Sequence, residues 1–114
     1  MKPLRHPLVA DGRGHRPPGD VLARTIRDHL LREAARRHCA GLSDRQAAHW
    51  LRDRLLIYRN GRWRRTCAEL KPPHPAGTID ALLWQLLWVR DAVPSDRTIR
   101  MALAHEPFSI AHQP

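Results

Sequence analysis

Histidine and cysteine are the residues of this chain best suited to bind a metal ion, because imidazole and thiolate are the usual ligands of structural zinc. The candidates are His38, Cys39, His49, Cys67 and His74. Their spacings match no common zinc pattern, since there is neither a Cys-x2-Cys nor a His-x3-His pair. We therefore predict no metal site and no bound cofactor.

Hydroxyl nucleophiles do not form a recognisable catalytic set either. Ser43 and Ser95 each precede an apolar helical pattern, so we expect them to be helix N-caps. No glycine-rich loop of the phosphate-cradling type is present. His105, near the end of the last expected helix, suits the negative end of the helix dipole without any catalytic role. We therefore expect that the protein is not an enzyme.

Arginine dominates the charge of the chain. The 114 residues include 20 Lys plus Arg against 11 Asp plus Glu, which gives a formal net charge of +9, and only Lys2 and Lys71 are lysines. A guanidinium group binds phosphate through a planar fork and also stacks on bases. We therefore expect a polyanionic partner, with nucleic acid first. The alternative is an arginine-rich composition that has no binding role.

The length of the chain and its apolar pattern restrict the architecture and the compartment. One hydrophobic core is expected at this length. Two cysteines are too few for a disulfide framework, and no apolar run is long enough for a signal peptide or a membrane span. We expect a cytoplasmic protein with reduced thiols and no membrane contact.

Helical patterns separated by breakers predict an all-α fold, a small bundle of about four helices. Residues 1–19 hold four prolines and three glycines and are expected to be a flexible basic arm. The helical domain is expected to span residues 20–105, with residues 106–114 as a tail. Its helices are expected at 20–39, 43–58, 79–91 and 95–105, with an extended proline-rich linker at 71–77.

The first expected helix is amphipathic. Its predicted core face consists of Leu22, Ala23, Ile26, Leu30 and Ala34. The opposite face carries charges at steps of four, namely Arg24, Asp28, Arg32 and Arg36. Asp28 can pair with an arginine on either side, so we expect this face to be solvated rather than a binding stripe.

The segment "RNGRWRRT" follows the second expected helix, which we expect to stop at Asn60 with Gly61 in the left-handed conformation. It surrounds one tryptophan with arginines, and it is expected to form an irregular segment or a single helical turn. This pattern suits a phosphate backbone, with candidate contacts at Arg59, Arg62, Trp63, Arg64 and Arg65. The alternative is that Trp63 plugs the bundle while the arginines point to water.

The third expected helix is apolar on two sides. Its wide core face is made of Ile79, Leu82, Leu83, Leu86, Leu87 and Val89. Opposite stand Trp84 and Trp88, one turn apart. Tryptophan is enriched at protein interfaces, so this pair predicts a homodimer contact or a site for another protein. The alternative is that the first helix or the arm folds over both rings.

The stretch "VPSDRTIRMALAH", residues 93–105, predicts a short helix capped by Ser95 with Ile99 facing inward. Together with the preceding helix and the "VPS" turn it resembles the helix-turn-helix DNA-binding class over residues 79–105. The resemblance implies that the last helix enters the major groove, with Arg97, Thr98 and Arg100 reaching base edges or phosphates. Two positions depart from that class, because Val93 stands at the usual turn glycine and Val89 at a usual small residue.

The interpretation that best joins these features is a small, basic, helical DNA-binding protein, expected to be a dimer. It would be a transcriptional regulator or a phage or plasmid accessory factor, with duplex DNA as its partner, the last helix for recognition and "RNGRWRR" with the arm for phosphates. One alternative is an adaptor or inhibitor that binds a protein partner through Trp84 and Trp88 and its arginine surface. The other is a protein that binds structured RNA.

Overall fold

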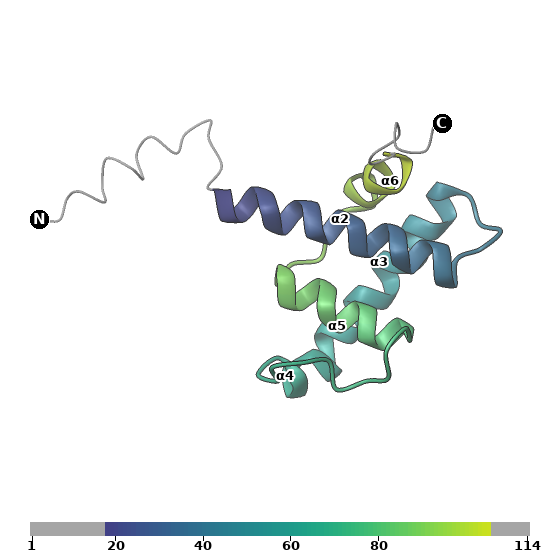
Figure 1. The fold of residues 1–114 in the computed structure, drawn as a ribbon. Helices are drawn as coiled ribbons and strands as arrows, with labels where there is room; N and C mark the ends of the chain where they lie inside the picture. The colour runs from purple at the N-terminus through teal and green to yellow at the C-terminus, as the bar shows by residue number, and fades with distance from the viewer. Residues whose placement is uncertain (1–17, 106–114) are drawn as a thin grey trace, which may run out of the picture.

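The computed structural model describes residues 18–105, and within this range the fold is an all-helical bundle, as the sequence predicts (Figure 1). It contains five helices: α2 (Pro18–His38), α3 (Asp44–Asn60), α4 (Arg62–Thr66), α5 (Ile79–Val89) and α6 (Asp96–Ala104). The helix beyond the expected four is α4, the single turn formed by "RWRRT". Most of the predicted arm and the predicted tail 106–114 lie outside the described residues.

The start of the helical domain differs from the prediction. Helix α2 begins at Pro18, two residues before the expected N-cap Asp20, so the last residues of the predicted arm 1–19 are helical. Proline is favoured in a first helical turn, because its missing N–H would have no partner there and its φ angle already suits the helix. Asp20 is then the acidic residue of the first turn, where the helix dipole favours a carboxylate.

Local signals set most of the other helix ends. Ser43 caps α3 with a full capping box shared with Gln46, and Thr78 and Ser95 cap α5 and α6 through their hydroxyl groups. Gly41 has the left-handed φ of 88° expected after the end of α2. The expected left-handed stop at Gly61 is wrong, since its φ is −124°, and the chain turns there directly into α4.

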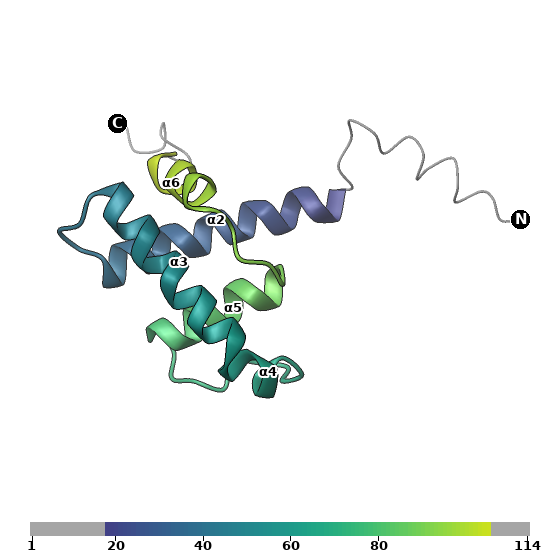
Figure 2. The ribbon, with the colours of Figure 1, turned by 180° about the vertical axis from the view of Figure 1, so that it is seen from behind.

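Helices α2 and α5 lie side by side and run in opposite directions. At one end the imidazole Nε2 of His38 lies 3.1 Å from the carbonyl oxygen of Gly77, and at the other end Arg90 lies 3.7 Å from a carboxylate oxygen of Asp20. Helix α3 crosses behind both in Figure 1 and in front of both in Figure 2. Together with α6 the three helices enclose the core, in which the largest fully buried side chains are Leu31, Leu51, Leu55, Leu83, Leu87 and Ile99.

Helix α6 lies on the other side of α2 from α5 and packs on α2 and α3 (Figures 1 and 2). It makes no packing contact with α5. Helices α5 and α6, over which the helix-turn-helix resemblance extends, are therefore not packed against each other in the described structure. The connection separates them, because Arg90 adopts an extended conformation and residues 90–95 carry the chain past α2 before α6 begins.

The core-facing side of α2 also differs from the predicted one. Leu22 and Ile26, expected in the core, are exposed, and Leu22 is 59% accessible. Of the predicted core residues, Ala34 is buried and Leu30 is partly buried against the core. The other buried positions of α2 are Leu31 and Arg27, which is only 7% accessible although it is charged. The predicted solvated face is partly buried as well, since Asp28 contacts the buried arginine through its carboxylate. The buried side of α2 is therefore rotated about the helix axis relative to the side predicted from its apolar residues.

Candidate nucleic-acid interface

The outer side of α6 presents two arginines. Ile99 and Ala102 face the core, whereas Arg97 and Arg100, three residues apart and therefore neighbours on the helix surface, are exposed. Neither guanidinium makes an ion pair with another described residue. Both side chains can therefore reach an external anion without breaking an internal contact.

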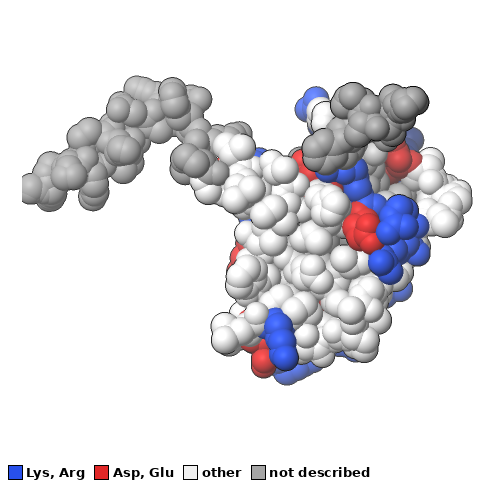
Figure 3. All heavy atoms as spheres, viewed as in Figure 1, with Lys and Arg blue, Asp and Glu red and all other residues white. Residues whose placement is uncertain are grey.

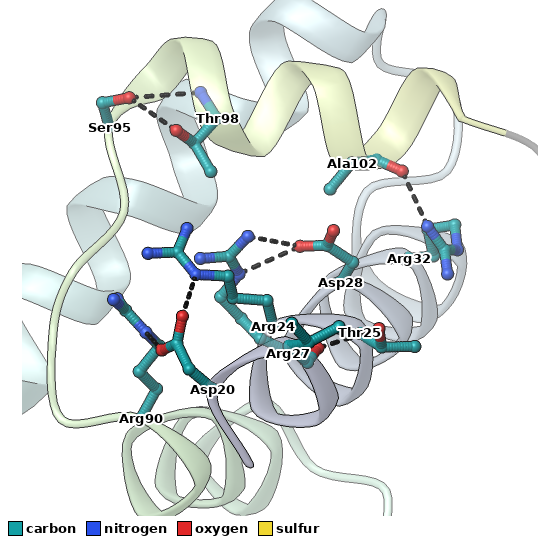
Figure 4. A network of polar contacts seen from close by, with 11 residues as sticks. Asp20, Arg24, Thr25, Arg27, Asp28, Arg32, Arg90, Ser95, Thr98 and Ala102 are labelled. Carbon is teal, nitrogen blue, oxygen red and sulfur yellow. Dashed lines mark hydrogen bonds and ion pairs between the residues drawn. The ribbon is translucent and has the colours of Figure 1, made fainter. Parts of the chain in front are cut away.

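Thr98, the third residue predicted to contact DNA on this helix, belongs to the helix cap instead. Its backbone N–H donates to the hydroxyl oxygen of Ser95 over 3.1 Å, and the two hydroxyl groups lie 3.1 Å apart (Figure 4). The side chain is half-buried and points back toward the start of α6. The hydroxyl of Thr98 is therefore engaged in fixing the helix end.

A groove of about 800 Å³ lies beside these arginines, between the first turn of α6 and the outer side of α3. It is lined by Leu42, Arg45, Gln46, His49, Trp50, Asp53, Asp96 and Arg100. The guanidinium of Arg54 lies over the ring of Trp50, 5.0 Å from its centroid, so a cation–π contact holds this tryptophan at the edge of the groove. The sequence did not predict that residues of α3 would line a candidate binding groove.

The signal for it is present in the sequence. The positions at 45, 49 and 53 recur every four residues, on the side of α3 opposite the buried Ala48, Leu51 and Leu55. Two basic residues and one carboxylate on one helix side are typical of an ordinary solvated face. They line a groove only because α6 packs beside α3, and sequence periodicity does not predict which helices pack together.

The "RNGRWRR" cluster is divided by the structure. Arg59 pairs with Asp91 over 2.9 Å and Arg62 pairs with Asp80, so both guanidinium groups fasten the end of α3 and α4 to the region of α5. Arg64 and Arg65 are exposed and have no carboxylate partner among the described residues. Only these two of the four predicted phosphate contacts are immediately available.

Trp63, expected to lie among these arginines as a stacking platform, is buried and 8% accessible. Its ring packs edge-on against Trp84, with centroids 6.2 Å apart. The alternative interpretation, that it plugs the bundle, describes its position. A base cannot stack on a ring that is covered by the core.

The two tryptophans of α5 do not form a joint surface patch. Trp84 is 2% accessible, and its indole N–H donates to the carbonyl oxygen of Thr66 over 2.9 Å. Trp88 is 55% accessible and stacks on Trp84, with ring centroids 6.0 Å apart. Of the pair, only Trp88 can contact a partner through its ring.

Several arginines of α2 and the region after α5 are also committed to internal contacts (Figure 4). The carboxylate of Asp20 forms ion pairs with Arg24 at 2.9 Å and with Arg90 at 3.7 Å. Arg32 donates a hydrogen bond to the carbonyl oxygen of Ala102 in the last turn of α6. A cation there satisfies a carbonyl without an intrahelical partner and favours the negative end of the helix dipole. These side chains join α2 to α5 and α6 and are not an open binding surface.

No group of three or more potential metal ligands is brought together anywhere in residues 18–105. The thiol of Cys39 is buried and its burial raises its pKa, so it is not held as a reactive thiolate. The hydroxyl of Tyr58 bonds to His74 over 2.8 Å and to Thr66 over 3.2 Å, and burial raises the pKa of Tyr58. The contact between Tyr58 and His74 fastens the proline-rich linker to α3, which gives both of these side chains a structural role.

Among the described helices, none has the combination of length and hydropathy needed to cross a bilayer. Comparisons with known proteins were negative: no family model matches the chain, and the searches of curated proteins and of solved structures gave no match.

Proposed function

We propose that this protein binds duplex DNA through the outer sides of α3 and α6. The observation that carries the proposal is the distribution of unpaired arginines. Carboxylates neutralise seven arginines elsewhere in the described chain, namely Arg24, Arg27, Arg36, Arg37, Arg59, Arg62 and Arg90. Arg45, Arg97 and Arg100 are exposed without such a partner and belong to the two helices that border the groove.

An unpaired arginine is worth more to DNA binding than a paired one. Binding a phosphate releases counterions condensed on the DNA, which supplies most of the non-specific affinity. An arginine already held by an aspartate must first give up that contact, so its net contribution is smaller. Among the described residues, the face formed by α3 and α6 offers three unpaired arginines, against the two, Arg64 and Arg65, on α4.

The shape of this region suits a duplex groove. Helix α6 has nine residues and is about 13 Å long at a rise of about 1.5 Å per residue, close to the roughly 12 Å width of the major groove. Arginine at this position suits guanine, which offers two acceptors on its major-groove edge. Asp53 and Asp96 also line the groove, and carboxylates accept a hydrogen bond from the amine of cytosine.

Duplex DNA is favoured over single-stranded nucleic acid because of where the aromatic rings lie. Single-strand binding relies on exposed aromatic side chains on a basic surface, on which successive bases stack. Trp63 and Trp84 are buried, and Trp50 is half-buried with Arg54 over its ring. Trp88 is exposed but belongs to α5, so the face formed by α3 and α6 has arginines for the backbone but no open stacking platform beside them.

The test is fluorescence anisotropy of a labelled random duplex against the protein at several salt concentrations, with single-stranded and hairpin RNA in parallel. The wild type should bind the duplex with a steep salt dependence. Replacing Arg45, Arg97 or Arg100 by alanine should each weaken binding and reduce the slope of log K against log salt by about 0.9 for every phosphate that the variant no longer neutralises. If Arg100 reads a base, its replacement should in addition relax the preference found by site selection.

Arg36→Ala is the matched control, because it removes the same charge from an exposed arginine of α2 that already pairs with Glu33 over 2.7 Å. It should leave both affinity and salt slope nearly unchanged. The proposal is refuted by an absence of duplex binding at low salt, by tighter binding to RNA than to DNA, or by an equal loss of affinity in Arg36→Ala and the three interface variants.

A further inference from the structure

One broad face of the molecule is almost free of charge. Figure 3 shows the side on which α2 and α5 lie in front of α3, and its middle carries no Lys, Arg, Asp or Glu. The full chain has a net charge of +9, so an uncharged area of this extent is unexpected on composition alone. Its charged groups are gathered toward the edges in that view.

The two helices of this face, α2 and α5, carry exposed apolar side chains. The ion pair between Arg90 and Asp20 places the first turns of α2 beside the end of α5. Leu22 and Ile26, one turn apart on α2, therefore lie level with the last turn of α5, which carries Trp88. All three are exposed large hydrophobic residues. Where exposed apolar side chains form a contiguous surface, they mark an interaction site more often than isolated apolar residues do.

We propose that this surface, the α2/α5 face, associates with a second copy of the chain. The argument is one of charge. An acidic partner would gain most at the unpaired arginines and little on an uncharged face. A second copy is itself strongly basic, and like charges brought together across an interface are costly, so it can dock closely only where neither surface carries charge. The middle of the α2/α5 face meets this condition.

The contact would be isologous, with the same residues facing their equivalents across a two-fold axis. Trp88 would then lie near its counterpart, where paired aromatic rings gain more than their buried area alone. Because the ring is already stacked on Trp84, it is held in one orientation before association. Little side-chain entropy remains to be lost, which favours binding.

This arrangement also fixes where the second basic surface lies, a consequence that rests on the proposed function. The groove lies between α3 and α6, and α3 crosses behind α2 and α5 in Figure 1. Two chains joined through their α2/α5 faces therefore present their α3 and α6 sides in opposite directions. The dimer would hold two separate duplex segments rather than two adjacent half-sites on one duplex.

Sedimentation equilibrium of the full chain tests the association without any DNA. The wild type should approach twice the chain mass of 13.1 kDa, and raising the salt concentration should not weaken it, because screening reduces only repulsion. Trp88→Glu and Leu22→Glu should each halve the observed mass. Leu22→Glu is the second variant because Trp88 also contacts the core, and circular dichroism would confirm that both remain helical.

Ile57→Glu is the matched control, because Ile57 is 68% accessible on α3, away from the proposed contact, and the change in charge is the same. It should remain dimeric. A monomeric wild type, a dimer that survives both Trp88→Glu and Leu22→Glu, or an equal loss of association in Ile57→Glu would overturn the proposal. A monomeric wild type is also the outcome if residues 1–17 of the same chain cover the face.

A bead assay tests whether one dimer holds two duplexes. Beads carry an unlabelled duplex, and the measurement is whether the protein retains a second, labelled duplex on them. The wild type should retain the label, whereas Trp88→Glu should bind single duplexes in solution but lose retention. A wild-type dimer that binds no duplex would refute the proposed function and leave self-association standing. A dimer that binds duplex but never joins two would overturn the opposed arrangement.

Discussion

Trp84 provides the clearest test of whether the tryptophans of α5 are core or surface residues. Its ring is almost fully buried, packs edge-on against Trp63 and stacks on Trp88. Its indole N–H donates to the backbone carbonyl of Thr66, which ties α5 to the end of α4. Trp84→Phe keeps an aromatic ring in place and removes the hydrogen bond and the second ring.

The expected loss of stability follows from these interactions. The hydrogen bond contributes about 1 kcal/mol net, and water can partly replace it because Thr66 is half-buried rather than enclosed. Complete truncation of a buried tryptophan costs about 3–5 kcal/mol, so the smaller change to phenylalanine should remove about 1 kcal/mol of packing. We expect Trp84→Phe to lower the free energy of unfolding by about 2 kcal/mol in total.

Urea and thermal unfolding followed by circular dichroism measure this change. A decrease of about 2 kcal/mol should lower the melting temperature of a domain of this size by roughly 10 °C. Trp88→Phe, compared at a protein concentration low enough for the chain to be monomeric, is the control and should cost less than about 0.5 kcal/mol, as is usual for exposed positions. Equal losses of stability in the two variants would refute the assignment of Trp84 to the core.

Two further predictions concern titratable groups. The guanidinium of Arg37, and then that of Arg36, lower the pKa of Glu33 from 4.5 to about 2. This carboxylate therefore stabilises the fold above pH 4.5 and loses its contribution as the pH falls toward 2. The difference in urea midpoint between wild type and Glu33→Gln should therefore be present at pH 6 and vanish near pH 2; a constant difference would contradict the linkage. For the thiols, a disulfide reagent should modify one cysteine per native chain quickly, the exposed Cys67, and the buried Cys39 only on unfolding. Cys67→Ser should remove the fast phase, and two thiols of equal rate would contradict the burial.

Helix ends were largely predictable from the sequence because they depend on neighbours within a few residues. The cap at Ser43 needs only its own hydroxyl and Gln46, and both hydrogen bonds of that box are formed. The stop at Gly61 was not predictable in the same way, because the conformation of this glycine depends on α4, which follows at once. Local chemistry indicated where the chain leaves a helix but not the direction it takes.

The candidate site was less predictable because its parts come from separate helices. The exposure of Arg97 and Arg100 follows from the spacing around the buried Ile99. Which helix lies beside them depends on the packing of α6 against α3, a contact between segments far apart in sequence. The fate of Arg62 likewise depends on Asp80, eighteen residues later, which sits in the first turn of α5.

In helix α2 the apolar residues of the sequence and the residues buried in the fold are partly different. Leu22 and Ile26 form the start of an apolar stripe that predicts burial, yet they face outward, while Arg27 is buried with Asp28 as its partner. Exposed apolar side chains bring no stability to a single chain, whereas a buried charge costs free energy unless it is paired. If a second copy covers the α2/α5 face, the stripe is buried after all, in the assembly rather than in the protomer. Leu22→Glu should then abolish association while leaving the unfolding free energy of the isolated chain nearly unchanged, a combination that a core position could not give.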